Sequence, residues 1–428
     1  MLQSTKKLLA SVGRRRFALG ASVAMLAAAA GVVLYPNGLF QPTVYSVAHE
    51  ETQGAEIGGI TAAMRHISPP DIIRAVYMTS WVAGTPDWRS QIVRMIEQNE
   101  LNAVVIDIKD YTGRVAFLVH DSVVAAYGAP EARIPDMAEF IRFLHEKNIY
   151  AIGRVSVFQD PYLVGRRPDL AVKRKSDGAV WKDYKGISWL DPASREVWEY
   201  HARIAREAER VGFDEINFDY IRFPSDGNMR DIAYDWWDGV RPKALVLKDF
   251  FAYLDRELTN LGVPISVDLF GMTTWNYDDL NIGQILEYAA PHFDYIAPMV
   301  YPSHYPKTFM GFANPAARPY EIIFAGISRA RDRLRMVGED WHKLRPWLQD
   351  FDLGAVYTPE MIRREKQAVY DAGLESWMLW DAANTYTLGA LDAELLPHAT
   401  TTLPLINAST TPFVPLPDEG SATTTPPQ

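Results

Sequence analysis

The segment Glu215–Phe223 has the sequence EINFDYIRF. It is a short, mostly apolar run of the kind that forms a buried strand in a parallel sheet. An acid flanked by phenylalanine and tyrosine in such a strand has few structural reasons to be there, so Asp219 is a candidate for function. Because side chains alternate along a strand, Asn217 and Ile221 are predicted to lie on the same face as Asp219.

Seven similar runs occur on either side of this segment, and each is predicted to be a buried strand. They are Arg74–Trp81, Ala103–Lys109, Tyr150–Phe158, Pro264–Gly271, Asp294–Tyr301, Leu344–Phe351 and Ser376–Ala382. Leu344–Phe351 has the weakest pattern. Helical periodicity between the runs predicts the helices Asp87–Gln98, Asp136–Lys147, Ser194–Arg210, Lys243–Leu261, Ile282–Ala289, Pro319–Met336 and Pro359–Ala372. Asn148, Gly212 and Gly262 can end three of these helices in the left-handed conformation.

This alternation predicts an α/β fold, the (β/α)8 TIM barrel, over residues 72–399. Eight strand–helix units in about 310 residues suit that fold. An open, doubly wound sheet is the alternative, and a misassigned seventh strand would favour it. No Gly-x-Gly-x-x-Gly follows the first strand, so a dinucleotide site is not expected.

The two ends of the chain differ from this pattern. Residues 1–40 combine basic residues with Phe17–Leu34, an uncharged and mostly apolar run, which predicts a signal peptide or a transmembrane anchor. Either one would place the barrel outside the cytoplasm, with an anchor making the membrane a partner. Residues 41–71 are predicted to be a linker. Residues 400–428 are rich in Thr and Pro and are predicted to be a disordered tail.

Composition excludes several classes of partner and site. The net charge of −10 argues against a nucleic-acid partner, because phosphate binding needs a basic face. Cysteine is absent, which excludes disulfides and thiolate metal sites. The nine histidines form no His-x-His or His-Glu-x-x-His pair, so no common zinc site, and no other metal or cofactor, is expected.

In a TIM barrel the active site lies at the C-terminal ends of the strands. Asp268 has the same strand parity as Asp219 and lies on the next strand, where the lateral spacing is about 4.8 Å. The two carboxylates can therefore face one cavity. Such a pair suits acid–base chemistry, in which one carboxylate stays ionised and the other holds a proton. Arg154 or Arg222 could keep one of them ionised, and apolar neighbours could raise the pKa of the other.

Other polar and aromatic residues at the strand ends are candidates for binding substrate. Aromatic faces stack on sugar rings while carboxylates and amides bind hydroxyls, although such aromatics can also simply pack between barrel and helices. Lys109 could suggest Schiff-base chemistry, but a salt bridge to Asp107 or Asp110 is preferred. The predicted substrate-binding residues are Asp107, Arg154, Asn217, Arg222, Trp275, Tyr301, Trp380 and Asp381.

Five motifs carry a resemblance to a known family: TSWVAG (79–84), ELNAVVIDIKD (100–110), GFDEINFDYIRFP (212–224), VDLFG (267–271) and APMVYP (297–302). Over roughly residues 73–390 the chain resembles the bacterial glycosyl hydrolase domains of unknown function, which are similar to alpha-amylase-like barrels. The resemblance implies that Asp219 is the nucleophile and Asp268 the proton donor. Two positions depart from the amylase-like pattern: Asn217 replaces a common arginine, and Asp268 replaces a common glutamate.

The predicted function is therefore glycoside hydrolysis of an extracellular or cell-envelope polysaccharide, with retention as the leading hypothesis and a carbohydrate as the partner. One alternative is a non-catalytic surface barrel that binds glycans. Another is an exported hydrolase of a different class that holds a metal at Asp107, Asp219 and Asp268.

Overall fold

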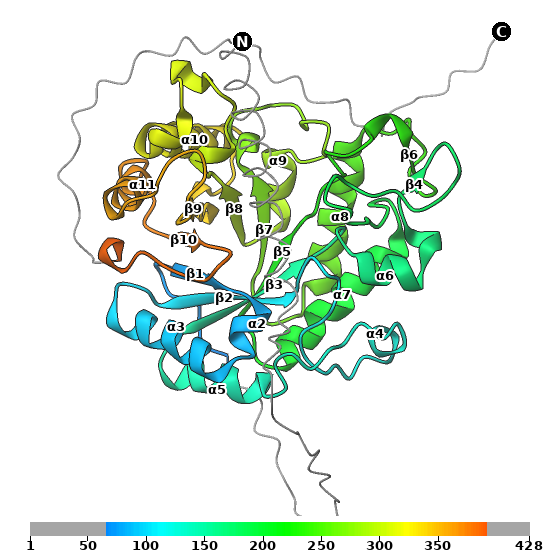
Figure 1. Ribbon diagram of the computed structural model, residues 1–428, viewed down its shortest axis with the longest axis horizontal. Helices are drawn as coiled ribbons and strands as arrows, with labels where there is room; N and C mark the ends of the chain where they lie inside the picture. Colours follow the sequence, from blue (N-terminus) through cyan, green and yellow to red (C-terminus); the bar gives the residue numbers. More distant parts are fainter. Residues whose placement is uncertain (1–65, 392–428) are drawn as a thin grey trace, which may run out of the picture. The chain divides into compact units, whose positions relative to one another are not determined.

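The computed structural model describes residues 66–391, which form a closed barrel of eight parallel strands surrounded by helices (Figure 1). The strand order around the barrel is β1-β10-β9-β8-β7-β5-β3-β2. Closure is direct, because Arg74 of the first strand pairs with Trp377 of the last. The TIM-barrel prediction is thus confirmed, and the open-sheet alternative is wrong because this sheet has no free edges.

Each of the eight apolar runs contains one strand of the barrel. The strands are β1 Arg74–Met78, β2 Ala103–Lys109, β3 Tyr150–Ser156, β5 Glu215–Asp219, β7 Ile265–Phe270, β8 Tyr295–Met299, β9 Trp347–Gln349 and β10 Trp377–Trp380. The weakest predicted run contains the shortest of them, the three-residue β9.

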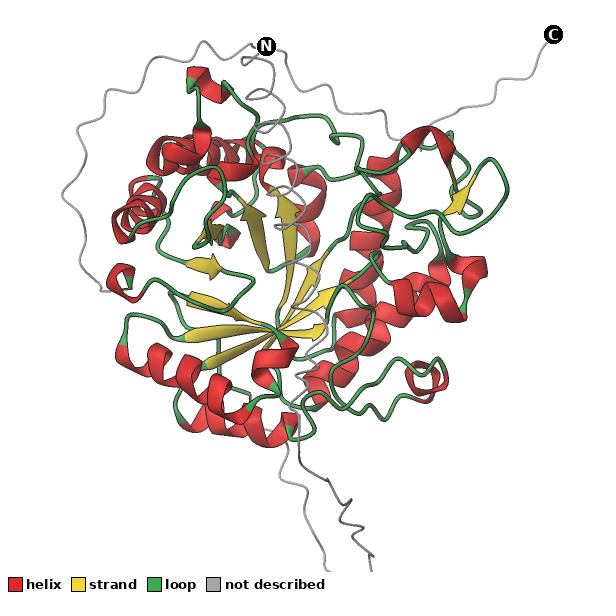
Figure 2. Ribbon diagram, viewed as in Figure 1, coloured by secondary structure: helices red, strands yellow, loops and turns green. Residues whose placement is uncertain are grey.

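The helices pack outside the barrel, and Figure 2 shows them around the central strands. The longer ones are α3 Pro86–Gln98, α5 Met137–Glu146, α7 Arg195–Arg210, α8 Lys243–Leu258, α10 Pro319–Met336 and α11 Pro359–Asp371; shorter ones are α2 Ser80–Ala83, α4 Ser122–Ala126, α6 Pro161–Arg166 and α9 Leu286–Ala289. Asn148, Gly212 and Gly262 have positive φ beyond α5, α7 and α8, as predicted. The predicted helix Ile282–Ala289 is confined to α9, because Gly283 has a φ of 86°.

Most strands end before the predicted residue, and β1 and β5 do so by the largest margin, for local reasons. The first run stops at Met78 because the side chain of Thr79 accepts a hydrogen bond from the Val82 amide (3.1 Å) and starts α2. The fourth run stops at Asp219 because Tyr220 adopts a φ of 53°, which no strand residue has. Arg222 therefore lies in the loop after β5, although the sequence placed it on the strand.

A second, two-stranded sheet was not predicted. β4 (Lys173–Arg174) pairs antiparallel with β6 (Ile232–Ala233), and each strand is too short to leave a periodic pattern. The sheet joins the long segment after β3 to the segment after β5. Trp181 adds a side-chain link between them by donating to the Asn228 carbonyl oxygen (3.1 Å).

The barrel interior is apolar in its middle and charged at both ends. Buried side chains from several strands, among them Tyr150 and Trp347, form an interior cluster separate from the larger core beneath the helices. Near the N-terminal ends, the Glu215 carboxylate forms a buried ion pair with Arg345 and accepts a hydrogen bond from Ser266 Oγ (2.5 Å). At the opposite end a second charged cluster forms the candidate site.

The predictions for residues 1–40 and 400–428, and for most of the linker 41–71, lie outside the described residues. The last part of that linker is ordered against the barrel, since the Ile67 amide donates to Asp214 Oδ1 (2.9 Å). Within residues 66–391, no helix has both the length and the apolar character needed to cross a membrane.

Candidate active site

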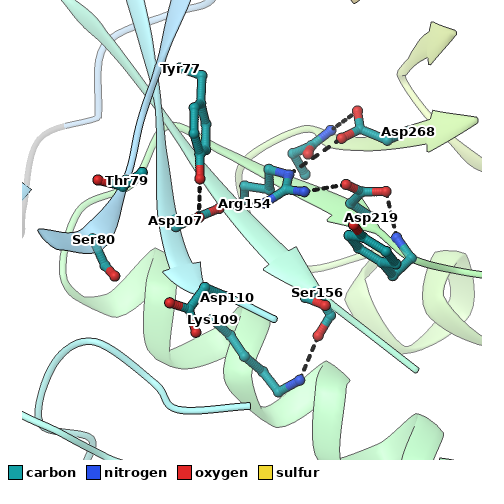
Figure 3. A network of polar contacts seen from close by, with 12 residues as sticks. Tyr77, Thr79, Ser80, Asp107, Lys109, Asp110, Arg154, Ser156, Asp219 and Asp268 are labelled. Carbon is teal, nitrogen blue, oxygen red and sulfur yellow. Dashed lines mark hydrogen bonds and ion pairs between the residues drawn. The ribbon is translucent and has the colours of Figure 1, made fainter. Parts of the chain in front are cut away.

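Three acids surround the guanidinium of Arg154 at the C-terminal end of the barrel (Figure 3). Nη1 donates to Asp107 Oδ1 on β2 (2.5 Å), and Nη2 donates to Asp219 Oδ2 on β5. Nε lies 3.6 Å from Asp268 Oδ2 on β7. All four residues are at most 5% exposed. Because buried carboxylates are costly without a partner, the single guanidinium is what allows this cluster to exist.

Asp268 lies in a setting that favours the protonated acid. Burial first, and then the neighbouring charge of Asp219, raise the pKa of Asp268 to about 8, against the opposing effect of Arg154. Its Oδ1 accepts hydrogen bonds from Asn217 Nδ2 (3.0 Å) and Trp347 Nε1 (2.8 Å), which fix the orientation of the group. Asp268 therefore holds a proton at neutral pH and points its other oxygen towards the cluster.

Asp219 has the opposite setting, because donors contact both of its oxygens. Arg154 donates to Oδ2, and the backbone amide of Tyr220 donates to Oδ1 (2.5 Å). The positive φ of Tyr220 accompanies this contact, and such a conformation costs an aromatic residue about 1–3 kcal/mol. Charge-assisted hydrogen bonds of this kind stabilise an ionised carboxylate.

Asp107 belongs to the same cluster but contacts an aromatic wall. Its Oδ2 accepts a hydrogen bond from the Tyr77 hydroxyl, and burial raises the pKa of Asp107 against the effect of Arg154. The Tyr77 ring stacks on Trp380, with centroids 3.9 Å apart. The Arg154 guanidinium lies 4.9 Å from the Trp380 ring centre, so the charged cluster and the wall are in contact.

Asp219 and Asp268 line one cavity of about 500 Å³. This volume is within the usual range for sites that enclose small ligands. Of the residues predicted to bind substrate, Arg154, Arg222, Tyr301 and Trp380 also line it.

Three of the predicted substrate-binding residues do not reach the cavity lining. Asp107 and Asn217 lie behind it and hold Arg154 and Asp268 in place. Asp381 is buried in a turn, where it accepts hydrogen bonds from the amides of Ala383 (3.2 Å) and Thr385 (2.7 Å). The contacts of these three residues are with the protein, so they could act only through the groups that line the cavity.

Trp275 lies apart from this cavity. It lines a separate hollow with Arg329, whose guanidinium is 5.3 Å from the indole ring, and it packs edge-on against Phe309 with centroids 4.8 Å apart. The sequence placed Trp275 just beyond the fifth predicted strand, but the short helical turn that follows β7 carries it outward.

The predicted salt bridge of Lys109 to Asp107 or Asp110 is wrong. Lys109 Nζ lies 2.9 Å from Asp160 Oδ2 and both side chains are fully buried, while Asp110 pairs with Arg133 (2.6 Å). An irregular register between β2 and β3, located between Asp107 and Lys109, turns the lysine away from the barrel interior.

Several residues of the site were not predicted from the sequence. Tyr77 and Trp347 point into the barrel, and strand alternation could have indicated Tyr77 because it follows Ala75 by two. Trp347 was obscured by the weak seventh run. Lys185 and Gln284 line the cavity from loops, which carry no periodic signal. His304, which follows the sixth predicted strand closely, lines it as well.

No group of three or more acidic or histidine side chains in residues 66–391 has an arrangement that could hold a metal ion. The three acids of the metal hypothesis instead share the guanidinium of Arg154.

The family model described as "Putative glycosyl hydrolase domain" matches residues 75–386. A hypothetical protein from Ruminiclostridium thermocellum of known structure is 35% identical, with 45% of this chain and 96% of that chain covered and a TM-score of 0.41. The PgaB (BpsB) glycoside hydrolase domain from Bordetella bronchiseptica is 14% identical, with coverage of 76% and 99% and a TM-score of 0.51, and it has a similar fold. No curated protein sequence matches the chain.

Proposed function

Because the chain belongs to this glycosyl hydrolase domain family, we propose that it hydrolyses O-glycosidic bonds of an extracellular or cell-envelope polysaccharide. One observation carries the proposal: two buried carboxyl groups, Asp219 and Asp268, line one cavity in opposite electrostatic settings. A carboxyl group with a raised pKa beside a second carboxyl group that is held by hydrogen-bond donors is typical of acid–base sites. The basic and apolar run within residues 1–40 supports a location outside the cytoplasm, which cell fractionation can check.

In the proposed mechanism Asp268 is the general acid. It would give its proton to the glycosidic oxygen as the bond to the sugar breaks. Asp219 would attack the anomeric carbon and form a glycosyl–enzyme ester. Water, deprotonated by Asp268, would then release the sugar and restore both groups.

Strand geometry supports the retaining form of this reaction. The residues before the two acids, Phe218 and Val267, are paired across β5 and β7, so Asp219 and Asp268 follow at the same level. Neighbouring strands lie about 4.8 Å apart, whereas inverting enzymes need about 6.5–9.5 Å between the carboxyls to admit a water. Nuclear magnetic resonance of the first-formed anomer tests this directly.

The function itself can be tested by incubating the full chain with a panel of polysaccharides and measuring new reducing ends. We expect turnover on at least one member, at the same rate with and without a chelator. Loss of activity in chelator would instead favour the metal-dependent alternative. Absence of turnover across the panel, with glycans still bound, would favour a non-catalytic barrel.

Trp380→Ala separates catalysis from binding. The indole stacks on Tyr77 and lines the cavity, so its loss removes an apolar face for a sugar ring. We expect KM for an oligosaccharide to rise about 10-fold with a smaller fall in kcat, since one aromatic contact contributes about 0.5–1.5 kcal/mol beyond area burial. Steady-state kinetics with Trp236→Ala as a control, an exposed indole outside the cavity, measures the effect. Equal losses in the two variants would contradict a sugar-binding role for Trp380.

A plot of kcat/KM against pH should fall on the alkaline side, because Asp268 loses its proton there. The acid works only when protonated, and its pKa is raised to about 8, so kcat/KM is retained below this value and falls about tenfold per pH unit above it. The measurement is kcat/KM between pH 5 and pH 10. In Asp268→Asn this fall should disappear from the residual rate. A fall that stays in this variant belongs to another group.

A further inference from the structure

The lining of the cavity carries more positive charge than the proposed reaction uses. Besides Arg154, the side chains of Arg222 and Lys185 line it. Neither has an ion-pair partner among residues 66–391, whereas Arg154 is surrounded by carboxylates. The lining thus holds two carboxyl groups, Asp219 and Asp268, and the three cationic side chains of Arg154, Arg222 and Lys185. This excess is unexpected in a chain whose net charge is −10.

Arg222 is held in place while part of its guanidinium stays available. The guanidinium lies 4.9 Å from the ring centre of Trp189 and 5.7 Å from that of Tyr220. Nη1 donates to Ser225 Oγ (2.9 Å) and to the Phe223 carbonyl oxygen (3.3 Å). Nε and Nη2 donate to no group in the described part of the chain. A planar fork held against aromatic faces is suited to binding a carboxylate through two parallel hydrogen bonds.

The acids nearest to Arg222, other than Asp219, accept hydrogen bonds from other groups and not from Arg222. Asp183 accepts hydrogen bonds from Trp189 Nε1 (3.1 Å) and from the amides of Lys185 and Ile187, both at 2.9 Å. Asp226 accepts a hydrogen bond from the Tyr184 amide (3.3 Å). These contacts shape the loop, and they leave the charge of Arg222 without a direct partner.

Lys185 reaches the same cavity from another direction. Its loop follows β4 and is tied to the segment after β5 through the small β4–β6 sheet. Across the cavity, burial together with the charge of Lys185 lowers the pKa of His304. Lys185 is exposed, and its ammonium group makes no hydrogen bond with residues 66–391. The loops after β3 and β5 thus bring two cations without ion-pair partners among residues 66–391 to the lining of the cavity that holds the acid pair.

We propose that Arg222 and Lys185 form a subsite for the carboxylate of a uronic acid, so that the polymer cleaved is an acidic polysaccharide. This inference rests on the proposed glycoside hydrolase function and names its substrate class. A neutral sugar would cover the partly buried guanidinium of Arg222 without pairing its charge, which is unfavourable. An anionic substrate would neutralise both cations, and the local positive field would offset repulsion from the acidic protein.

The test uses matched pairs of oligosaccharides: oligouronates from several polyuronic acids and their carboxyl-reduced, neutral derivatives. Calorimetric titration of each into the full chain, carrying Asp219→Asn to prevent turnover, measures Kd. We expect at least one oligouronate to bind more tightly than its neutral counterpart. Adding Arg222→Gln should weaken that binding about 10- to 100-fold, the range for hydrogen bonds to charged groups, and leave neutral binding within about 2-fold.

Two further variants distinguish a loss of the carboxylate contact from a disturbance of the loop. The Lys185 side chain makes no hydrogen bond or ion pair with residues 66–391, and Lys185→Gln should weaken oligouronate binding about 3- to 10-fold. Lys182→Gln changes an exposed lysine of the same loop outside the cavity, and it should have no effect. Tighter binding of the neutral members, equal losses on both members, or no binding of any oligouronate would overturn the inference. Failure of the proposed function is distinct from all of these, because it is seen as binding without turnover in the unmodified chain.

Discussion

Asp219→Asn is expected to lower kcat by about 10⁴-fold or more while the barrel stays folded. The carboxylate is the proposed nucleophile, and an amide oxygen cannot form the glycosyl–enzyme ester. The asparagine keeps one acceptor oxygen, so it can accept from Arg154 or from the Tyr220 amide but not from both. The side chain keeps its size, so the barrel should stay folded with a modest loss of stability. The measurements are reducing-end release under saturating substrate and the thermal unfolding midpoint.

Asp268→Asn is the matched control, because it removes the proposed acid and keeps the nucleophile. On the polysaccharide its kcat should fall about 10²- to 10⁴-fold, the usual contribution of general acid catalysis. On an aryl glycoside with a good leaving group, which departs without protonation, kcat/KM should fall much less. The rate at saturating substrate should stay low, because Asp268 also activates the water of the second step. Asp219→Asn should be inactive on both substrates. Equal behaviour of the two variants on the aryl glycoside would contradict the assignment of roles, and an active Asp219→Asn enzyme would end the proposal.

Arg154→Met is expected to cost both activity and stability. The substitution leaves the buried carboxylates of Asp107 and Asp219 without their shared cation, and Asp268 loses a nearby positive charge. Removing one partner of a buried ion pair typically destabilises a protein by about 3–5 kcal/mol. Chemical denaturation at pH 7 should show a loss of this size, and turnover should be undetectable. Much of the lost stability should return as the pH falls and the carboxyl groups take up protons.

A second substitution separates charge from shape at this position. Arg154→Met combined with Asp107→Asn has one fewer unpaired buried carboxylate. About 1–3 kcal/mol of the lost free energy of unfolding should therefore be recovered, while activity stays absent. Arg154→Lys keeps one positive charge but cannot contact three acids at once, and it should fall between the wild type and Arg154→Met. Full stability in Arg154→Met would show that the guanidinium does not hold the cluster together.

The barrel could be predicted because buried parallel strands must be apolar on both faces, which leaves contiguous runs in the sequence. The ends of those runs could not, because they depend on single residues. Thr79 turns the chain into a helix with its side chain, and Tyr220 leaves the strand through a left-handed conformation. A tyrosine rarely adopts this conformation, so its sequence context gave no sign that the strand would end there. Arg222 was therefore predicted on a strand, although it lies in a loop.

The acid pair was predictable in outline, since alternation along neighbouring strands places Asp219 and Asp268 on the inner face. Their shared contact with Arg154 was not, because the sequence left Arg154 and Arg222 as equal candidates. Only the closed barrel shows which of them lies among the acids. The cations of Lys185 and Arg222 were beyond prediction as a pair, since the small sheet that joins their loops has strands of two residues each.

The stacked rings of Tyr77 and Trp380 come from β1 and β10, the first and last strands of the barrel. The segment after β10 also holds β1, because Asn384 and Tyr386 donate to the carbonyl oxygen of Tyr77. The acids of the site are therefore synthesised before Trp380, and the ring contact with Tyr77 can form only once β10 is present. Proteolytic halves would lack it as well. The β1–β10 pairing and the ring contact across it thus depend on the same two strands, so both should be lost together in any chain that ends before β10.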